Sequence, residues 1–108
     1  MYNTFKNLKD IPGKELLPGF VGRLIHTDQI SISIFEIKAG SVLPEHKHFH
    51  EQTSIVQEGE FEFTIDGKTK VVNKGDYICI APDTPHSAKA ITDCVIMDIF
   101  SPVREDYK

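Results

Sequence analysis

Short runs of β-branched and aromatic residues, broken by turn residues, constrain the fold of this sequence more than any other feature. No segment shows a convincing helical periodicity. Many short strands at this spacing are typical of an antiparallel sandwich or a closed barrel, so we expect an all-β fold. The runs predicted to be strands are Phe20 to His26, Ile30 to Ile37, Thr53 to Val56, Glu60 to Ile65, Tyr77 to Ala81 and Val95 to Phe100.

One of these runs alternates clearly and ends in a turn. Phe61, Phe63 and Ile65 share one face of an extended chain, and polar residues stand between them. Asp66-Gly67 follows, and both residues tolerate the positive φ that a two-residue hairpin needs. This segment therefore predicts a strand that returns through a tight hairpin.

The length and charge of the chain limit the classes of protein it can be. Its 108 residues fit one compact domain, of which residues 1–18 are expected to form an edge strand or an arm. A net charge of −4 and the lack of a basic run argue against a nucleic-acid partner, because neutralising phosphates takes clustered Lys and Arg. No apolar stretch approaches the ~20 residues of a membrane span.

The start of the chain and its cysteines favour a cytoplasmic protein. The sequence MYNTFKNLKDIPGKELLPG lacks the apolar core of a signal peptide. Cys79 and Cys94 lie inside apolar segments without metal-ligand spacing. Buried free thiols in a reducing compartment are the simplest interpretation, and a disulfide is the alternative.

Histidines at every second position, in the stretch PEHKHFHEQ, indicate a metal site. In an extended strand His46 and His48 project to one side, and Gln52 keeps the same parity. Two converging imidazoles suit a first-row transition metal, and His86, which follows a proline-stiffened turn, is the obvious ligand from elsewhere. The alternative is a solvated histidine cluster beside acidic neighbours.

The spacing around these histidines resembles the two motifs of the cupin superfamily. Gly40-x5-His46-x-His48-x3-Gln52-x6-Gly59 resembles the first motif, and Gly75-x6-Pro82-x3-His86 resembles the second. The two motifs span residues 40–86. The resemblance implies a single-domain antiparallel β-barrel of the jelly-roll type. It also implies that His46, His48, Gln52 and His86 are the metal ligands.

Two positions depart from the cupin pattern. Gln52 stands where the family usually has glutamate, and its neutral amide leaves the charge of a metal uncompensated, which makes the ion a stronger Lewis acid. Asp83 stands where glycine is frequent, and aspartate tolerates a left-handed conformation better than most residues. The imidazole-rich set accepts Zn, Ni, Mn, Fe or Co. His50 is expected either behind the ligands or in solvent, and His26 to be a packed or surface histidine.

A single acid interrupts the last apolar run. By alternation Asp98 shares a face with Cys94, Ile96 and Phe100. It is either a buried acid paired with backbone or Arg, or an acid or base that faces the metal with its pKa set by burial. Arg104 follows Pro102, and folded back over the barrel mouth it could bind a carboxylate through two hydrogen bonds.

This tail resembles that of the small single-domain cupins of the KdgF family, which take part in pectin degradation. The matching residues are Asp98, Phe100, Ser101, Pro102 and Arg104. The resemblance implies that Asp98, Phe100 and Arg104, within residues 98–104, line the active site. It also implies conversion of 4,5-unsaturated monouronates from pectin or alginate into a linear 4-deoxy-5-keto uronate. From the residues alone, Phe100 is equally a core aromatic.

Two other kinds of function fit the same residues. One is a different metal-dependent cupin enzyme, such as a dioxygenase, an isomerase or a decarboxylase. The other is a non-catalytic cupin that binds a small molecule. Because exposed edge strands invite pairing, a homodimer is expected in each case.

Overall fold

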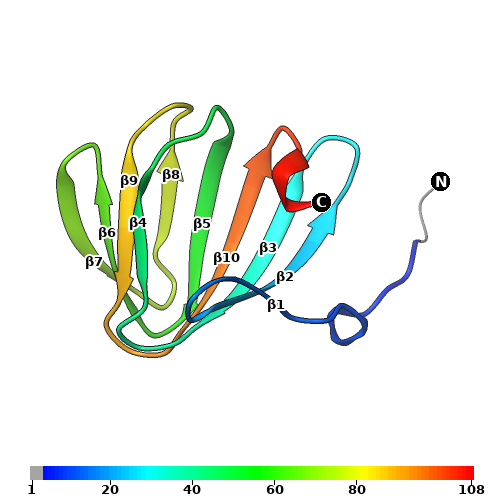
Figure 1. Ribbon diagram of the computed structural model, residues 1–108, viewed down its shortest axis with the longest axis horizontal. Coiled ribbons are helices and arrows are strands. Elements are labelled where there is room, and N and C mark those ends of the chain that lie inside the picture. Colours follow the sequence, from blue (N-terminus) through cyan, green and yellow to red (C-terminus); the bar gives the residue numbers. More distant parts are fainter. Residues whose placement is uncertain (1–3) are drawn as a thin grey trace.

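Two antiparallel β-sheets make up the fold in the computed structural model, which describes residues 4–108 (Figure 1). One sheet has six strands in the order β1-β2-β3-β10-β5-β8, and the other has four in the order β4-β9-β6-β7. Two short 3-10 turns, η1 (Leu8–Asp10) and η2 (Glu105–Tyr107), lie near the ends. The strands are β1 (Lys14–Leu17), β2 (Phe20–His26), β3 (Ser31–Ile37), β4 (Val42–His46), β5 (Glu51–Glu58), β6 (Glu60–Ile65), β7 (Lys68–Asn73), β8 (Tyr77–Ile80), β9 (His86–Ala90) and β10 (Cys94–Ser101).

The expected all-β jelly roll is confirmed, as two sheets rather than a closed barrel. From β4 to β10 the chain passes back and forth between the four-stranded and the six-stranded sheet. Among the described residues, every pair of hydrogen-bonded strands lies within one of the two sheets. The sheets therefore face each other as a sandwich, and the space between them is available for a core and a site.

The predicted strand boundaries agree with the structure for some strands, whereas other strands were not predicted. β2 and β6 have the predicted bounds, and the hairpin between β6 and β7 places Asp66 at φ 50° and Gly67 at φ 79°. The sequence did not reveal β4, β7 and β9, because β4 contains a proline and the other two carry lysine, serine or small residues. Pairing with their neighbours makes these segments strands.

Within residues 1–18, the described part contains both features that were expected as alternatives. β1 is the edge strand of the six-stranded sheet and pairs with β2, whereas residues 4–13 extend away from the sheets (Figure 1). Residues 1–3 of this segment lie outside the described residues. Among residues 4–108, no helix is long and apolar enough to cross a membrane.

The apolar core fills one part of the space between the sheets. Burying a large apolar side chain contributes roughly 1.5–3 kcal/mol, so this cluster supplies the main force that holds the sheets together. Its fully or nearly buried members are Phe20, Phe35, Ile37, Val56, Phe61, Phe63, Val72, Ile80, Ala88, Ala90, Cys94 and Ile96.

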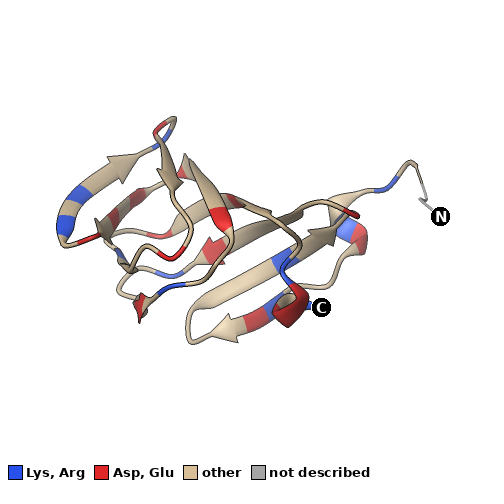
Figure 2. Ribbon diagram, turned by 90° about the horizontal axis from the view of Figure 1, so that it is seen from above, with Lys and Arg blue, Asp and Glu red and all other residues tan. Residues whose placement is uncertain are grey.

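The charged residues and the two cysteines are distributed differently with respect to this core. Lys and Arg are interspersed with Asp and Glu along the described ribbon (Figure 2). Both cysteines are free, so the disulfide alternative is wrong. Cys94 is buried as expected, but Cys79 is exposed because it points outward from β8, next to the buried Ile80.

Candidate metal centre and cavity

Polar side chains replace the apolar core toward one end of the six-stranded sheet. On β10, Asp98 lies opposite Ser33 of β3 and Ser54 of β5. The next inward-facing residue, Phe100, lies opposite Gln52. Alternation keeps all five side chains on the inner face, where they are buried. The interior at this end is therefore built to hold polar groups rather than to close a core.

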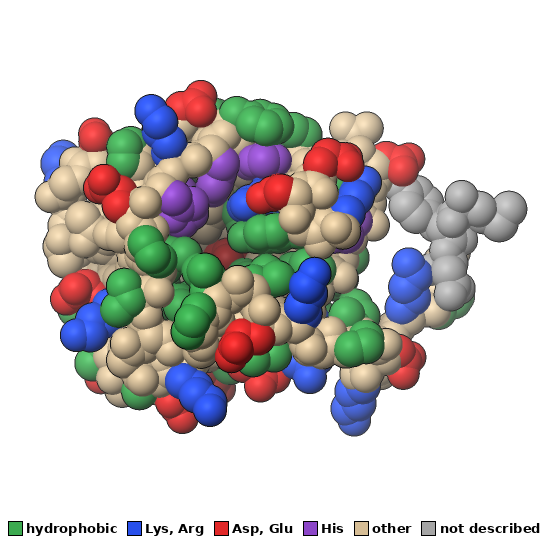
Figure 3. Space-filling model, in the orientation of Figure 1, with side chains coloured by type: hydrophobic (Ala, Val, Ile, Leu, Met, Phe, Trp, Pro, Cys, Tyr) green, Lys and Arg blue, Asp and Glu red, His purple; other side chains and the backbone are tan. Residues whose placement is uncertain are grey.

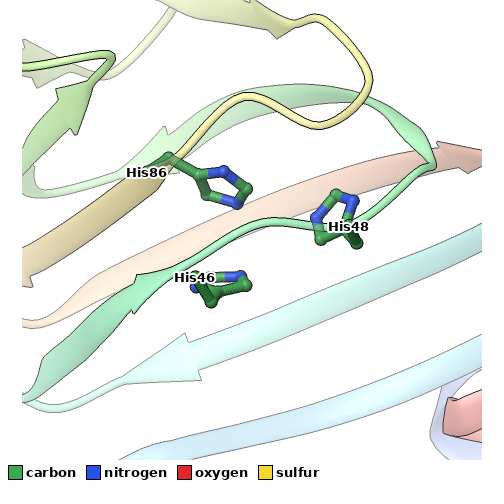
Figure 4. Close-up of side chains that lie close together, drawn as sticks. All are labelled: His46, His48 and His86. Atoms are coloured by element: carbon green, nitrogen blue, oxygen red, sulfur yellow. The ribbon is translucent and has the colours of Figure 1, made fainter.

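Three histidines converge next to this polar region (Figure 4). His46 ends β4 and pairs with His86 at the start of β9, while His48 lies in the connection from β4 to β5. The potential ligand atoms of the three rings lie within 4.8 Å of one another. The rings turn toward a shared space in Figure 4, so they form one cluster.

The route by which these histidines meet differs from the one expected. The extended strand ends at His46, and the chain then bends at residues 49–50 as it crosses from the four-stranded to the six-stranded sheet. His48 and Gln52 therefore do not share a strand with His46. The crossing between sheets, and not strand parity, brings them to one place.

Backbone carbonyls fix the protonation of each ring in the cluster. A carbonyl oxygen only accepts hydrogen bonds, so each Nδ1 must carry the proton and each Nε2 must present a lone pair. Metal-binding histidines usually donate their other ring N–H in this way. The contacts are His46 Nδ1 to Pro44 O at 2.9 Å, His48 Nδ1 to His50 O at 3.1 Å and His86 Nδ1 to Thr84 O at 2.8 Å.

Two of the lone pairs that result, those of His48 and His86, have no suitable protein donor. The Nε2 of His86 is buried without a hydrogen-bond partner. The Nε2 of His48 lies 3.1 Å from Oε1 of Gln52, and the Gln52 amide nitrogen is used as a donor to Ser54 Oγ at 2.9 Å. Two acceptors thus face each other at His48 and Gln52. A cation among these atoms would satisfy all of them, so the residues fit a divalent transition metal.

Burial keeps two members of the cluster, His48 and His86, in the neutral form that binds metals. It lowers the pKa of His48 to about 4, with a further contribution from the charge of Arg104. Burial likewise lowers the pKa of His86. Both rings are therefore neutral at pH 7, which is the protonation state that a metal ligand requires.

Asp98 is a buried acid held by hydroxyl groups. Ser54 Oγ donates to its Oδ1 at 2.5 Å, and Ser33 Oγ lies 3.4 Å from its Oδ2. Burial raises the pKa of Asp98 to about 6, although these hydrogen bonds act in the opposite direction. Asp98 makes no ion pair with Arg104 in the described structure, so the alternative of an Arg-paired acid is not what is found.

Arg104 folds back over this end of the sandwich, as expected. Its backbone N–H donates to Ser31 Oγ at 2.8 Å, and the residue is only 6% exposed. The guanidinium carbon lies 4.6 Å from the centre of the Phe100 ring and 3.9 Å from that of Tyr107. Asp106 accepts hydrogen bonds from Nε at 3.0 Å and Nη2 at 2.8 Å.

A cavity of about 370 Å³ joins these groups, which is the size of a small-molecule site. Figure 3 shows histidine side chains beside a hollow with hydrophobic walls. Of the residues chosen from the sequence, six line this cavity, namely His46, Gln52, His86, Asp98, Phe100 and Arg104. Further lining residues that sequence reasoning missed are Leu16, Leu17, Phe20, Phe35, Leu43, Pro44, Glu45 and Tyr107.

Two other histidines lie outside the cluster. His50 is 5% exposed and stacks on the exposed ring of Phe49 at a centroid distance of 4.1 Å, while its carbonyl accepts from His48. It therefore lies behind the cluster and not in solvent. His26 is a partly exposed histidine of β2 whose Nδ1 lies 2.7 Å from Ser31 Oγ.

Comparison with known proteins decides the family. The cupin domain model matches residues 33–100, which is more than half of the chain. The chain belongs to the cupin family. The two histidine motifs predicted a cupin, and this prediction is confirmed. The cupin match also covers the region that holds Gln52, His86, Asp98 and Phe100.

Within the cupins, the chain is similar to KdgF proteins. It is 28% identical over 101 residues to the pectin degradation protein KdgF of Dickeya dadantii (strain 3937), covering 91% of this chain and 92% of that protein. The structure of KdgF from Halomonas sp. matches with a TM-score of 0.92 and 26% identity, covering 99% of this chain and all of that one. An RmlC-like cupin from Shewanella frigidimarina NCIMB 400 matches with a TM-score of 0.93 and 28% identity, over 99% and 97% of the two chains.

Proposed function

We propose that this cupin is a metal-dependent enzyme that converts 4,5-unsaturated monouronates from pectin or alginate into the linear 4-deoxy-5-keto uronate. The observation that carries this proposal is the meeting of a histidine cluster, a buried acid and a buried guanidinium at one cavity. The similarity to KdgF proteins over almost the whole chain supports the substrate class.

We infer that His46, His48, Gln52 and His86 hold the metal. When bound, a divalent ion such as Zn, Ni, Mn, Fe or Co supplies a Lewis acid for an oxygen of the sugar or of water. Gln52 adds no negative charge to the set. Its amide is oriented by donation to Ser54, which leaves its oxygen directed at His48.

We assign proton transfer on the substrate to Asp98 and binding of its carboxylate to Arg104. The conversion is an isomerisation: after the ring opens, a proton leaves the oxygen on C5 and a proton is added at C4. Asp98, with a pKa of about 6, can hold or release that proton near neutral pH. Arg104 has N–H groups left over from its contacts with Asp106, and these would bind the substrate carboxylate. Phe100, 2% exposed and beneath the guanidinium, would form a wall of the pocket.

The test is an ultraviolet assay on purified, metal-analysed protein. Unsaturated monouronates made by a pectate lyase and by an alginate lyase are each offered, and loss of absorbance from the conjugated C4=C5 bond is followed. We expect loss of absorbance with a 4-deoxy-5-keto product. Oxygen consumption instead would indicate a dioxygenase, and recovery of unchanged ligand from a complex would indicate a binding protein; either result contradicts the proposal.

We also propose that the chain forms a homodimer, with the outer face of the six-stranded sheet as the contact. On that face Met97 lies between Ile34 and Ile55, and Ile99 lies opposite Ile32. These side chains are partly exposed, and none is charged. From strand spacings, the patch covers roughly 300 Å², which suits the apolar centre of an interface that needs about 800 Å² per partner. A second copy presents the same uncharged rows through a two-fold axis, so it is the occupant that fits.

Light scattering coupled to size-exclusion chromatography tests this dimer. We expect the mass of a dimer for the wild type and of a monomer for Met97→Glu, with the far-ultraviolet circular dichroism unchanged. A wild-type monomer at micromolar concentration, or a folded Met97→Glu dimer, would contradict the assignment.

A cytoplasmic location is likewise proposed. The two free cysteines support it, because thiols persist in reducing compartments, and cell fractionation tests it.

A further inference from the structure

We infer that Asp106 is a positioning residue for Arg104, so that η2 (Glu105–Tyr107) acts as a substrate-recognition element at the end of the chain. The inference rests on the proposed function, because it assumes that Arg104 binds the carboxylate of a uronate. Nothing in the cupin motifs points to Asp106. It lies after the last residue of the matched region and was not singled out from the sequence.

The contacts of Arg104 show how its side chain is fixed. Phe100 and Tyr107 lie 4.6 and 3.9 Å from the guanidinium carbon and hold the group by its faces. Asp106 accepts from Nε and Nη2, which fixes how the group is rotated within its own plane. A free arginine side chain has rotamer entropy to lose on binding a ligand. In this structure the ordering is already present before a ligand arrives.

The position of Asp106 leaves part of the guanidinium free for a ligand. Its side chain is 59% exposed and is not among the groups that line the cavity, whereas Arg104 is. Asp106 therefore approaches from the solvent side. The Tyr107 side chain is a further hydrogen-bond partner of Arg104. Of the five N–H groups of Arg104, Asp106 takes one from Nε and one from Nη2, so Asp106 itself leaves both from Nη1 and one from Nη2. Two of these suffice for a carboxylate bound at two points.

The backbone of the same turn supports this arrangement. The N–H of Tyr107 donates to the carbonyl of Arg104 at 3.0 Å and closes the turn around the ion pair. The pKa of Asp106 is lowered, chiefly because Arg104 donates hydrogen bonds to it. The carboxylate is thus ionised throughout the neutral range. The opposite role would be one in which Asp106 competes with the substrate carboxylate for Arg104. The experiment separates these two roles.

The experiment compares Asp106→Asn with the wild type in the ultraviolet assay and in calorimetric titration with D-galacturonate, a saturated uronate that cannot react by this route. Asparagine keeps the shape but accepts at only one atom and carries no charge. We expect KM to rise roughly tenfold while kcat stays within about twofold, since a charge-assisted contact is worth at least ~1.4 kcal/mol. Galacturonate affinity should fall by a similar factor, and metal content should not change.

Two further variants serve as controls. Glu105→Gln lies in the same turn and loses only the exposed contact with Lys108, so its constants should match the wild type. Asp106→Glu restores the charge and should recover part of the affinity. Thermal melts of all variants show whether each is folded.

Several results would overturn the inference. A lower KM in Asp106→Asn would make Asp106 a competitor of the substrate, and unchanged constants would give it no role. A fall in kcat alone, or a lower melting temperature with no change in galacturonate affinity, would make it merely structural. If the wild type has no turnover but galacturonate binding still depends on Asp106, the proposed reaction fails while the positioning role stands.

Discussion

The two sheets supply different chemistry to the same cavity. The four-stranded sheet contributes imidazoles, from His46 at the end of β4 and His86 at the start of β9. The six-stranded sheet contributes a carboxyl group from Asp98 and an aromatic wall from Phe100, and Arg104 follows its strand β10. One side of the cavity is thus suited to hold a cation, and the other to hold an anionic substrate and move its protons. The comparison teaches that the two tasks should be separable by mutation.

Gln52 and Ser54 are the link between the two sides. Both lie on β5 in the six-stranded sheet, but the oxygen of Gln52 faces His48. Ser54 accepts from the Gln52 amide and donates to Asp98. The amide proposed as a metal ligand and the acid proposed to act on the substrate therefore share one hydroxyl group. Mutations at cavity residues other than Gln52 and Ser54 should therefore affect either metal binding or the action on the substrate, with little effect on the other.

The largest effect is expected on the histidine side. His86→Ala removes a buried ring whose Nε2 has no protein partner, so metal content should fall from about one ion per chain to nearly none. Equilibrium dialysis followed by elemental analysis measures this. His26→Ala, a histidine outside the cluster, should retain the metal. A folded His86→Ala protein that keeps one tightly bound ion would contradict the assignment of metal binding to the histidine side of the cavity.

The next largest effect is expected on the acid side. Asp98→Asn keeps the size of the side chain but removes its ability to transfer a proton, so kcat should fall by roughly 10²–10⁴. Metal content should stay at the wild-type level, in contrast to His86→Ala. The ultraviolet assay and elemental analysis are run on the same preparation. Near-normal turnover by Asp98→Asn would rule out its proposed role.

A third prediction concerns stability and pH. The pKa of Asp98 is raised to about 6 by burial, above its ordinary value of 3.8. A raised pKa means that the folded state prefers the protonated acid. Its stabilising contribution is therefore fully present below 3.8 and is lost as the pH rises through about 6. The full change corresponds to about 3 kcal/mol.

Urea unfolding of chelator-treated protein measures this contribution. Since other groups titrate in the same range, among them His48 with its pKa lowered to about 4, the useful quantity is the difference between the wild type and Asp98→Asn. The wild type should lose about 3 kcal/mol relative to the variant between about pH 4 and pH 7.5. If the difference in unfolding free energy between the wild type and Asp98→Asn does not vary with pH, burial does not destabilise the ionised form of Asp98. The electrostatic difference between the two sides of the cavity would then be contradicted.

The smallest effect is expected from a change just below the polar region. Ile96 precedes Asp98 by two residues on β10, faces the same way and lies opposite Phe35 and Val56. Ile96→Val should cost about 1 kcal/mol of unfolding free energy through the lost methylene group. Metal content and KM should be unchanged. A large change in KM would show that the core and the cavity are not independent layers.

Strong local patterns made the fold predictable in part. Runs of β-branched and aromatic residues predicted β2 and β6 with their bounds, and Asp66-Gly67 predicted the hairpin. β4, β7 and β9 depend on pairing with distant strands, which a local pattern does not contain. The histidine cluster was predictable from residue type and motif spacing. Its geometry was not, because the crossing between sheets after His46 replaced the expected extended strand.

The surroundings of the cavity were the least predictable part. Leu16, Leu17 and Tyr107 come from the two ends of the chain and reach the cavity only through tertiary folding. No periodic pattern marks such residues. The bond between Arg104 and Asp106 spans two positions, but many such pairs lie in solvent and contribute little. Burial of the arginine makes this one different, and burial becomes visible only in the structure.

Anomalous diffraction from crystals of metal-loaded protein tests the central claim most directly. We expect one peak per chain, within bonding distance of Nε2 of His46, His48 and His86 and of Oε1 of Gln52. A strong peak elsewhere with this cluster empty, or no peak at saturating metal, would contradict the claim that the two sheets meet at a metal.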